Sequence, residues 1–218
     1  MKEILFASAS FLIAAFAFGY GVFRLFRKKI PLYLQLYVCA AGCFALERLS
    51  AAVNLWCGVY EPFSIGMLGI FGCNFFLLSA NFGTLDKIVD DGTDSRKART
   101  SAIAAPIAMA LLLLGVFLAW KKTELFGAFL WIFLLLPILP ASYFNLKHLL
   151  LPPDPFGFLK ATRACNDSAL CFSVIEALCG AFSAGGGSVL SSVFPILASL
   201  SAAALTISAV KGAKKWGI

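Results

Sequence analysis

Polar side chains recur along one side of an apolar segment near the start of the chain. Between Pro31 and Trp56 they follow intervals of four, four, four, three and four residues: Gln35, Cys39, Cys43, Glu47, Ser50 and Asn54. This spacing predicts one slowly rotating face of a helix. A carboxylate in a membrane-length segment costs a few kcal/mol if it meets lipid, so we expect Glu47 to face a bundle interior or a water-filled cavity. Arg48 points about 100° away and needs a partner of its own.

A second polar face follows near the other end of the chain. Its spacing is seven, three and four residues: Asn166, Ser173, Glu176 and Gly180. At about 1.5 Å per residue, Glu176 lies as deep below the end of its segment as Glu47 does, and Asn74 comes to a similar depth. We therefore predict a polar pocket for a small molecule or ion, open to the outside. Its predicted lining is Glu47, Arg48, Asn54, Asn74 and Glu176.

The same residues also allow a purely structural interpretation. Arg48 and Glu176 could form a buried ion pair, and Asn74 could donate a hydrogen bond to a neighbouring helix. Both interactions would hold helices together without binding a ligand. We favour a binding site because ionisable groups at membrane depth usually serve a function.

An acidic and basic stretch between residues 85 and 100 suggests two phosphate chemistries. Asp90, Asp91 and Asp94 spell DDxxD, a magnesium-diphosphate pattern, and 91–96 approaches the DGxxAR of membrane phosphatidyl transferases. Both need further aspartates at fixed spacing, but the next acid is Glu124. We therefore expect a solvated loop. An intramembrane enzyme is the third alternative, since the sequence shows no nucleophile with a base.

The cysteines and the single histidine show no metal-site spacing. Six of the seven cysteines lie inside apolar segments, and no CxxC pair occurs. His148 has no thiolate or imidazole at ligand distance along the chain. We expect the cysteines to pack in the interior, His148 to lie at the membrane interface, and no metal or cofactor to bind.

Seven apolar stretches must position these side chains. Each has the roughly 20 residues that cross a hydrocarbon core. They span 4–26, 31–56, 63–82, 102–120, 125–146, 161–182 and 189–210. With 61% hydrophobic and 13% charged residues, the chain cannot hide its apolar surface in a soluble globule. We predict an all-α, polytopic integral membrane protein whose 218 residues form one seven-helix bundle.

The start of the chain has features of a secretory signal. Lys2, an apolar run and Ala15, Phe16 and Ala17 imitate a signal with its cleavage site, but the run continues to Phe26. We expect an uncleaved first helix.

The basic residues predict the orientation of the bundle. One side collects fourteen of them: Arg24, Arg27, Lys28, Lys29, Lys87, Arg96, Lys97, Arg99, Lys147, Lys160, Arg163, Lys211, Lys214 and Lys215. The other side has only Lys2, Lys121 and Lys122. Because basic loops stay in the cytoplasm, we expect the N-terminus outside and the C-terminus inside, in a bacterial cytoplasmic membrane. The net charge of +7 then indicates contact with anionic lipid headgroups, not with nucleic acid.

Aromatic residues, prolines and glycines refine this picture. Trp56 and Trp120 are expected at the outer headgroup boundary. Pro137 and Pro140 should bend the fifth segment, because each removes a backbone hydrogen bond. Gly66, Gly69 and Gly72 repeat every three residues and should let the third helix approach a neighbour closely.

Two functions from different classes fit these features. The first is a small-molecule or ion transporter, or binding protein, with an outward-facing intramembrane pocket. The second is a receptor-like or regulatory membrane subunit that signals through a separate protein partner or as a homo-oligomer.

Overall fold

The computed structural model describes residues 2–26, 30–59, 64–85, 96–151, 158–184 and 189–215, and over these ranges it is all-helical. Seven helices are long and apolar enough to cross a membrane, as the sequence predicts. The uninterrupted ones are α1 (Lys2–Leu25), α2 (Leu32–Trp56), α9 (Phe158–Ser183) and α10 (Val189–Lys215). The third combines η1 (Ile65–Met67), α3 (Leu68–Leu78) and η2 (Ser79–Leu85); the fourth, α5 (Arg96–Ala102) and α6 (Ala104–Trp120); the fifth, α7 (Leu125–Leu135) and α8 (Ile138–Leu150).

Prolines explain two of the interruptions. The predicted bend in the fifth segment is confirmed, since α7 ends at Leu135 and α8 begins at Ile138. In a continuous α-helix, the Pro140 ring would clash with the carbonyl of Leu136, four residues earlier. Pro106 acts in the same way on Ala102, where α5 ends. With α5 included, the fourth helix begins six residues before the expected 102, and α8, α9 and α10 also extend beyond their predicted limits.

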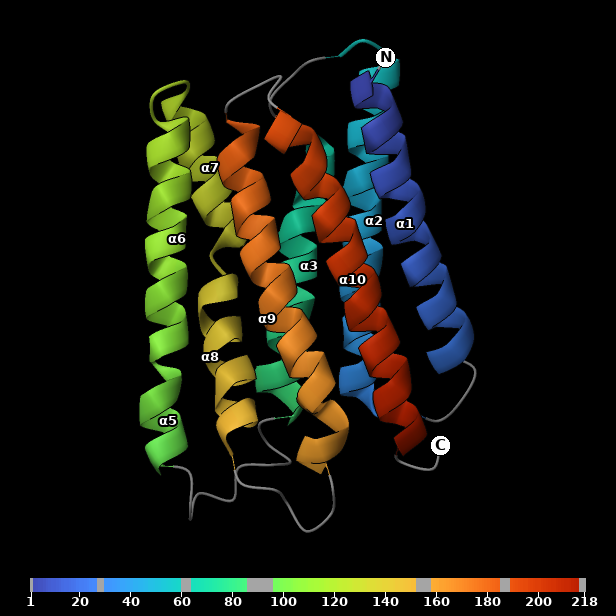
Figure 1. Cartoon of the computed structure of the whole chain (residues 1–218), viewed down its shortest axis with the longest axis vertical. Helices are drawn as coiled ribbons and strands as arrows, with labels where there is room; N and C mark the ends of the chain where they lie inside the picture. Colours follow the sequence, from blue (N-terminus) through green and yellow to red (C-terminus); the bar gives the residue numbers. More distant parts are fainter. Residues whose placement is uncertain are drawn as a thin grey trace.

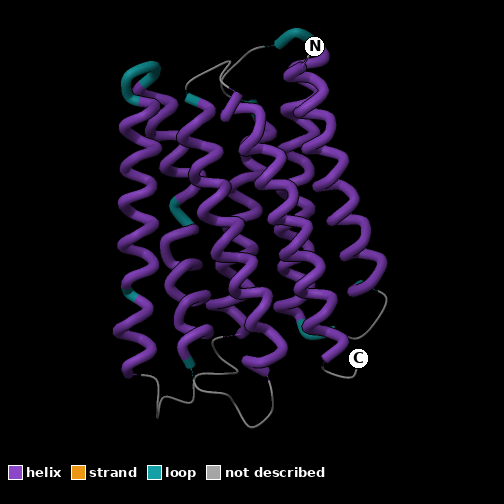
Figure 2. The backbone as a smooth tube through the Cα atoms, viewed as in Figure 1, coloured by secondary structure: helices purple, strands orange, loops and turns teal. Residues whose placement is uncertain are grey.

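The seven helices run side by side along the long axis of the molecule (Figure 1; Figure 2). We call the end where α1 begins the upper end and the end where α10 ends the lower end. The two termini lie at opposite ends, as an odd number of long helices running alternately up and down requires (Figure 1). α1, α2 and α10 form one side of the bundle, α5 to α8 form the other, and α3 and α9 lie between them (Figure 1).

Two apolar cores flank the central helices. One contains residues of α1, α2, α3, α9 and α10, with Tyr33, Leu34 and Phe172 fully buried. The other joins α3, α6, α7 and α9 around Val116 and Leu135. Polar side chains on α2, α3 and α9 lie where the two cores meet.

Glycines bring α3 against α2, as predicted. A Cβ atom on Gly69 would meet the backbone of Cys43 and lie 2.9 Å from Glu47 Cβ. On Gly72 it would lie 3.1 Å from Cys43 Sγ. Only residues without a side chain permit this approach, and it presses α3 onto the turn of α2 that carries Glu47.

Candidate functional site

Arg48 finds its partner in the preceding residue. Its Nε and Nη2 atoms donate to the two carboxylate oxygens of Glu47, and the pair is buried, with 9% and 5% of the residues exposed. The guanidinium also lies 5.4 Å from the Phe44 ring centroid. The alternative ion pair with Glu176 is therefore wrong. Two of the five guanidinium N–H groups are used by Glu47, which leaves three for other partners.

Glu176 approaches this pair from α9, and Asn74 from α3. Both are almost fully buried, at 2% and 1% exposed. The Glu176 carboxyl lies within electrostatic range of Asn74, Glu47 and Arg48. However, neither of its oxygens and neither polar atom of the Asn74 amide has a hydrogen bond in good geometry. We call Glu47, Arg48, Asn74 and Glu176 the upper cluster.

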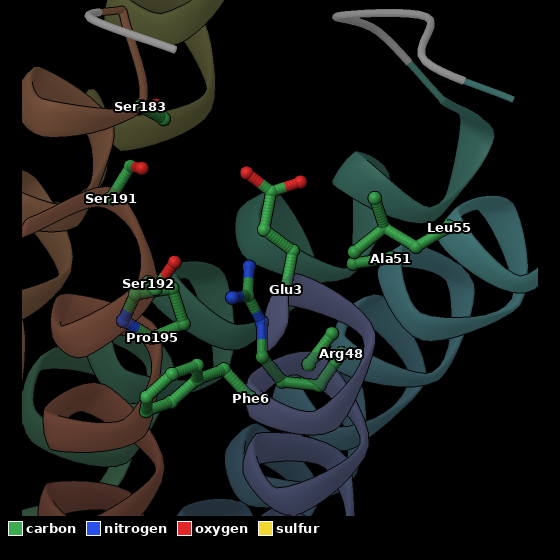
Figure 3. Close-up of a pocket in the computed structure, with 10 residues that line it drawn as sticks. Glu3, Phe6, Arg48, Ala51, Leu55, Ser183, Ser191, Ser192 and Pro195 are labelled. Carbon is green, nitrogen blue, oxygen red and sulfur yellow. The ribbon is translucent and has the colours of Figure 1, made fainter. Parts of the chain in front are cut away.

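A pocket of about 250 Å³ lies near the upper end of the bundle, and Arg48 is the member of the upper cluster that lines it (Figure 3). Arg48 projects into it from α2, and the Glu3 carboxylate of α1 lies nearer the mouth (Figure 3). Serine hydroxyls line the opposite wall, on α9 and α10: Ser183, Ser191 and Ser192. Phe6 and Pro195 supply apolar surface. The pocket thus offers a cation, an anion and hydroxyls to one small ligand.

The predicted lining residues separate into two faces of α2. The face that carries Glu47 and Ser50 packs on the third helix, where Ser50 lies 3.3 Å from the Ser64 hydroxyl. Asn54 is half-buried beyond Ser50 and does not line the pocket. Arg48, Ala51 and Leu55 form the face toward the pocket. The structure therefore brings Glu47, Arg48, Asn74 and Glu176 together, but of the five residues predicted to line a pocket only Arg48 lines this one.

An apolar layer lies below the upper cluster. Phe44 of α2 and Phe172 of α9 pack edge to face, with ring centroids 5.2 Å apart, and both are fully buried. Along α2, Phe44 lies between Arg48 and Tyr37; along α9, Phe172 lies between Glu176 and Asn166. The aromatic pair therefore separates the upper cluster from a second polar group.

This second group, the lower network, links four helices by hydrogen bonds. Tyr37 donates to Asn166 Oδ1 over 3.1 Å, and Asn81 Nδ2 donates to the Tyr37 hydroxyl over 3.1 Å. Asn81 Oδ1 lies 3.1 Å from His148 Nδ1. All four residues are buried. His148 is therefore buried between helices, with Asn81 as its polar partner, and its interfacial depth stays a prediction.

The lower network also has a signal in the sequence, beyond the predicted polar face that contains Asn166. Asn81, Asn145 and Asn166 each interrupt an apolar segment, as Asn74 does. The rule that made Asn74 a candidate applies to all of them. Asn81 lies on the π-helical segment η2, a rare conformation that often accompanies functional sites.

Trp120 and the cysteines complete the comparison with the predicted positions. Trp120 is only 6% exposed, and its indole N–H donates to the Gly180 carbonyl over 2.7 Å. It therefore connects α6 to α9 at the upper end of α6, whereas Trp56 is exposed; the headgroup position expected for both stays a prediction. Cys57 and Cys171 are exposed and the other cysteines are at least half-buried.

The aspartate-rich stretch with its DDxxD spacing lies outside the described residues. Within the described ranges, no group of three or more His, Cys, Asp or Glu side chains could hold a metal ion. Comparisons with family models, curated proteins and solved structures find no match for this chain. The site must therefore be interpreted from its own chemistry.

Proposed function

We propose that the chain is an integral membrane protein that binds and transports a small polar molecule through the pocket at its upper end. The exterior of the bundle supports the membrane assignment. Large apolar side chains point outward from α1, α2, α6 and α7, with Phe16 75%, Leu46 65%, Leu111 65% and Phe129 60% exposed. Glu47, Arg48, Asn74 and Glu176 lie inside instead. A soluble protein rarely exposes apolar surface on this scale, whereas lipid covers it without cost.

The basic residues support an upper end that faces the outside. Ten described lysines and arginines lie toward the lower end: Arg24, Arg96, Lys97, Arg99, Lys147, Lys160, Arg163, Lys211, Lys214 and Lys215. Among the described lysines and arginines, only Lys2, Lys121 and Lys122 lie at the upper end. This distribution is typical of a bacterial cytoplasmic membrane protein with its C-terminus inside. Anionic headgroups would then surround the lower end.

Native Cys57 tests the orientation directly. It is exposed near the upper end of α2, so an impermeant thiol reagent should label it in intact cells. A cysteine at position 96 in a Cys57→Ser chain should react only after the cells are opened. The opposite pattern would invert the proposed orientation.

The pocket supports a ligand that carries both a negative and a positive group. The three remaining N–H groups of Arg48 can donate to a carboxylate. The Glu3 carboxylate near the mouth can accept a hydrogen bond from an ammonium group. At about 250 Å³ the pocket is smaller than the roughly 300–1,000 Å³ typical of drug-sized ligands. A zwitterion the size of an amino acid satisfies all three conditions.

Transport is supported by the polar groups beyond the pocket. The upper cluster and the lower network follow one another along α2 and α9, and the Phe44–Phe172 pair lies between them. A carrier needs such a barrier between two polar regions, so that its binding site opens to only one side of the membrane at a time. Rotation of the two rings would connect the regions.

Thermal unfolding in detergent tests the binding step. The probes are an amino acid, its carboxamide and its decarboxylated amine, each over a series of side chains, with small sugars as unrelated compounds. We expect stabilisation by one or more amino acids, because a ligand at 100 times its Kd adds about 2.7 kcal/mol. The carboxamide and the amine should have little effect. If no amino acid raises the unfolding temperature, the assigned ligand class is wrong.

Glu3 and Glu124 provide a matched pair of variants. Both are exposed carboxylates at the upper end, but only Glu3 lines the pocket. Glu3→Gln should weaken binding of the amino acid by about two- to fivefold, as expected for a partly exposed ion pair. Glu124→Gln should leave the affinity unchanged. Equal effects of the two changes would place the ligand elsewhere.

Uptake by proteoliposomes distinguishes the two function classes. A carrier should accumulate the amino acid that stabilises it, and lose uptake and binding together in Glu3→Gln. Binding without uptake would support the alternative of a receptor-like subunit with a separate protein partner.

A further inference from the structure

The upper cluster contains more carboxyl groups than cationic groups. Glu47 and Glu176 bring two carboxyl groups, and Arg48 brings one guanidinium. Glu47 occupies that guanidinium through both of its oxygens. Glu176 is therefore a buried carboxyl group without a counter-cation of its own, and an ionised carboxylate in this position is costly.

The unsatisfied atoms around Glu176 form a complementary set. Neither carboxyl oxygen of Glu176 has a hydrogen bond in good geometry. The same holds for the nitrogen and the oxygen of the Asn74 amide. A carboxylate can only accept, so it would use the Asn74 nitrogen and leave the amide oxygen facing a negative charge. A carboxylic acid can accept from that nitrogen and also donate its O–H to the amide oxygen. Protonation of Glu176 thus gives a hydrogen-bond partner to both carboxyl oxygens and to both polar atoms of the Asn74 amide.

We propose that Glu176 is a proton-binding site, and that its proton is exchanged with water in the pocket when the ligand binds. One proton from solution bonds to a carboxylate oxygen and gives the neutral acid; deprotonation returns it to water, and no electrons move. The proton site stands on the contacts of Glu176 itself. Only its coupling to a ligand rests on the function proposed above.

A ligand carboxylate at Arg48 would favour the protonated form. It would add a negative charge close to Glu176. It would also bind the Arg48 guanidinium, whose positive charge otherwise favours ionised Glu176. Linkage then requires that protonation of Glu176 tightens binding by the same factor. Proton and ligand would thus enter the bundle together.

The groups around Glu176 favour a proton over a metal cation. On α2 they are Glu47 and Arg48; the Cys73 thiol faces Glu176 from α3, and the Cys179 thiol lies on α9. Trp131, which packs on the same stretch of α9 from α7, is uncharged, as is Ser192 of α10 in the pocket. A guanidinium beside the carboxyl disfavours a second full cation. A proton instead leaves a neutral acid.

Infrared spectroscopy of the purified chain tests the proton site without any ligand. Ordinary carboxyl groups ionise at about pH 4, so a band from a protonated carboxylic acid at neutral pH would mark an unusual group. We expect this band in the native chain and in Glu124→Gln, and its loss in Glu176→Gln. Absence of the band from the native chain, or its persistence in Glu176→Gln, would overturn the assignment.

A second variant covers the case in which Glu176→Gln does not fold. Asn74→Leu retains Glu176 but removes the amide oxygen that would accept its O–H. The carboxylic acid band should then move to higher frequency, because a free acid carbonyl absorbs above a hydrogen-bonded one. An unchanged band would show that Asn74 is not the partner and would overturn the paired arrangement.

Sodium provides the competing outcome. Thermal unfolding in sodium chloride and in choline chloride at equal concentration should give the same midpoint for the native chain. A sodium-specific stabilisation that Glu176→Gln abolishes would replace the proton by a metal cation.

Proton uptake on binding tests the coupling. Calorimetry with the stabilising amino acid, in two buffers of different ionisation enthalpy, should show proton uptake by the native chain and none by Glu176→Gln. Binding without proton uptake in the native chain would overturn the coupling. A chain that binds no probe but retains the infrared band would instead disprove the proposed ligand and leave the proton site intact.

Discussion

The upper cluster and the lower network are both buried polar groups, but they satisfy their hydrogen bonds to different degrees. In the lower network, Asn81 bonds both Tyr37 and His148, and Tyr37 continues to Asn166. In the upper cluster, the side-chain hydrogen bonds of the described residues join Arg48 and Glu47, two neighbours on one helix. The lower network thus connects helices to one another. The upper cluster instead contains buried polar atoms without hydrogen bonds, and its Arg48 lines a pocket.

This difference supports the upper cluster as the region of the proposed ligand, although the Asn166 amide nitrogen of the lower network also has no hydrogen bond. Unpaired polar atoms in a protein interior cost stability, so they persist where something else bonds them during function. The lower network needs no ligand to explain its central bonds. Its π-helical segment and four-helix contacts fit a role in holding the lower end together.

The largest expected effect comes from removing the charge of Arg48. Arg48→Met leaves Glu47 buried without a partner and should reduce the free energy of unfolding by about 3–5 kcal/mol. Chemical denaturation in detergent micelles would measure it. The double change Glu47→Gln with Arg48→Met should recover most of the loss, since no charge is then stranded. A double variant as unstable as the single one would show that the pair is not the stabilising unit.

A smaller effect is expected from Tyr37→Phe in the lower network. The change removes one hydroxyl that bonds both Asn166 and Asn81, and should cost about 2–3 kcal/mol. Tyr143→Phe is the matched control, because Tyr143 is only half-buried and stands outside the network; it should be nearly neutral. Ligand binding should survive Tyr37→Phe. Loss of binding in a folded Tyr37→Phe protein would remove the functional distinction between the two regions.

The smallest effect concerns the packing that positions Glu47. Gly69→Ala would push its methyl group onto the Cys43 backbone, and should cost about 1–2 kcal/mol through overpacking. Gly115 has open space around its Cα, so Gly115→Ala should be neutral or stabilising by up to about 1 kcal/mol through helix propensity. Thermal midpoints of the two variants measure the contrast. A neutral Gly69→Ala would mean that α3 moves freely against α2.

Local sequence patterns were sufficient to predict the seven helices and the break near Pro137. Both depend on properties of a single segment, namely apolar length and the missing N–H of proline. The polar face of α2 was also predictable, because periodicity shows which residues share a side. That face proved to pack on glycines, and the pocket lies on the side of Arg48.

The partners of the polar residues could not be predicted in the same way. Neighbours in sequence do not normally face each other on a helix, so nothing in the spacing indicates that Arg48 folds back onto Glu47. His148 and Trp120 have polar partners on helices that are far away in the sequence. Such contacts depend on how helices are placed beside one another, which periodicity within one helix does not determine.

The π-helical segment η2 affects how the chain can change its length. A π turn holds one residue more than an α turn, so loss of one residue within Ser79–Leu85 can be absorbed as the segment tightens to α. The same loss in the middle of α9 would rotate every later residue by about 100°. Related chains one residue shorter can therefore keep the third helix in phase with its neighbours, and the missing residue should fall in this segment.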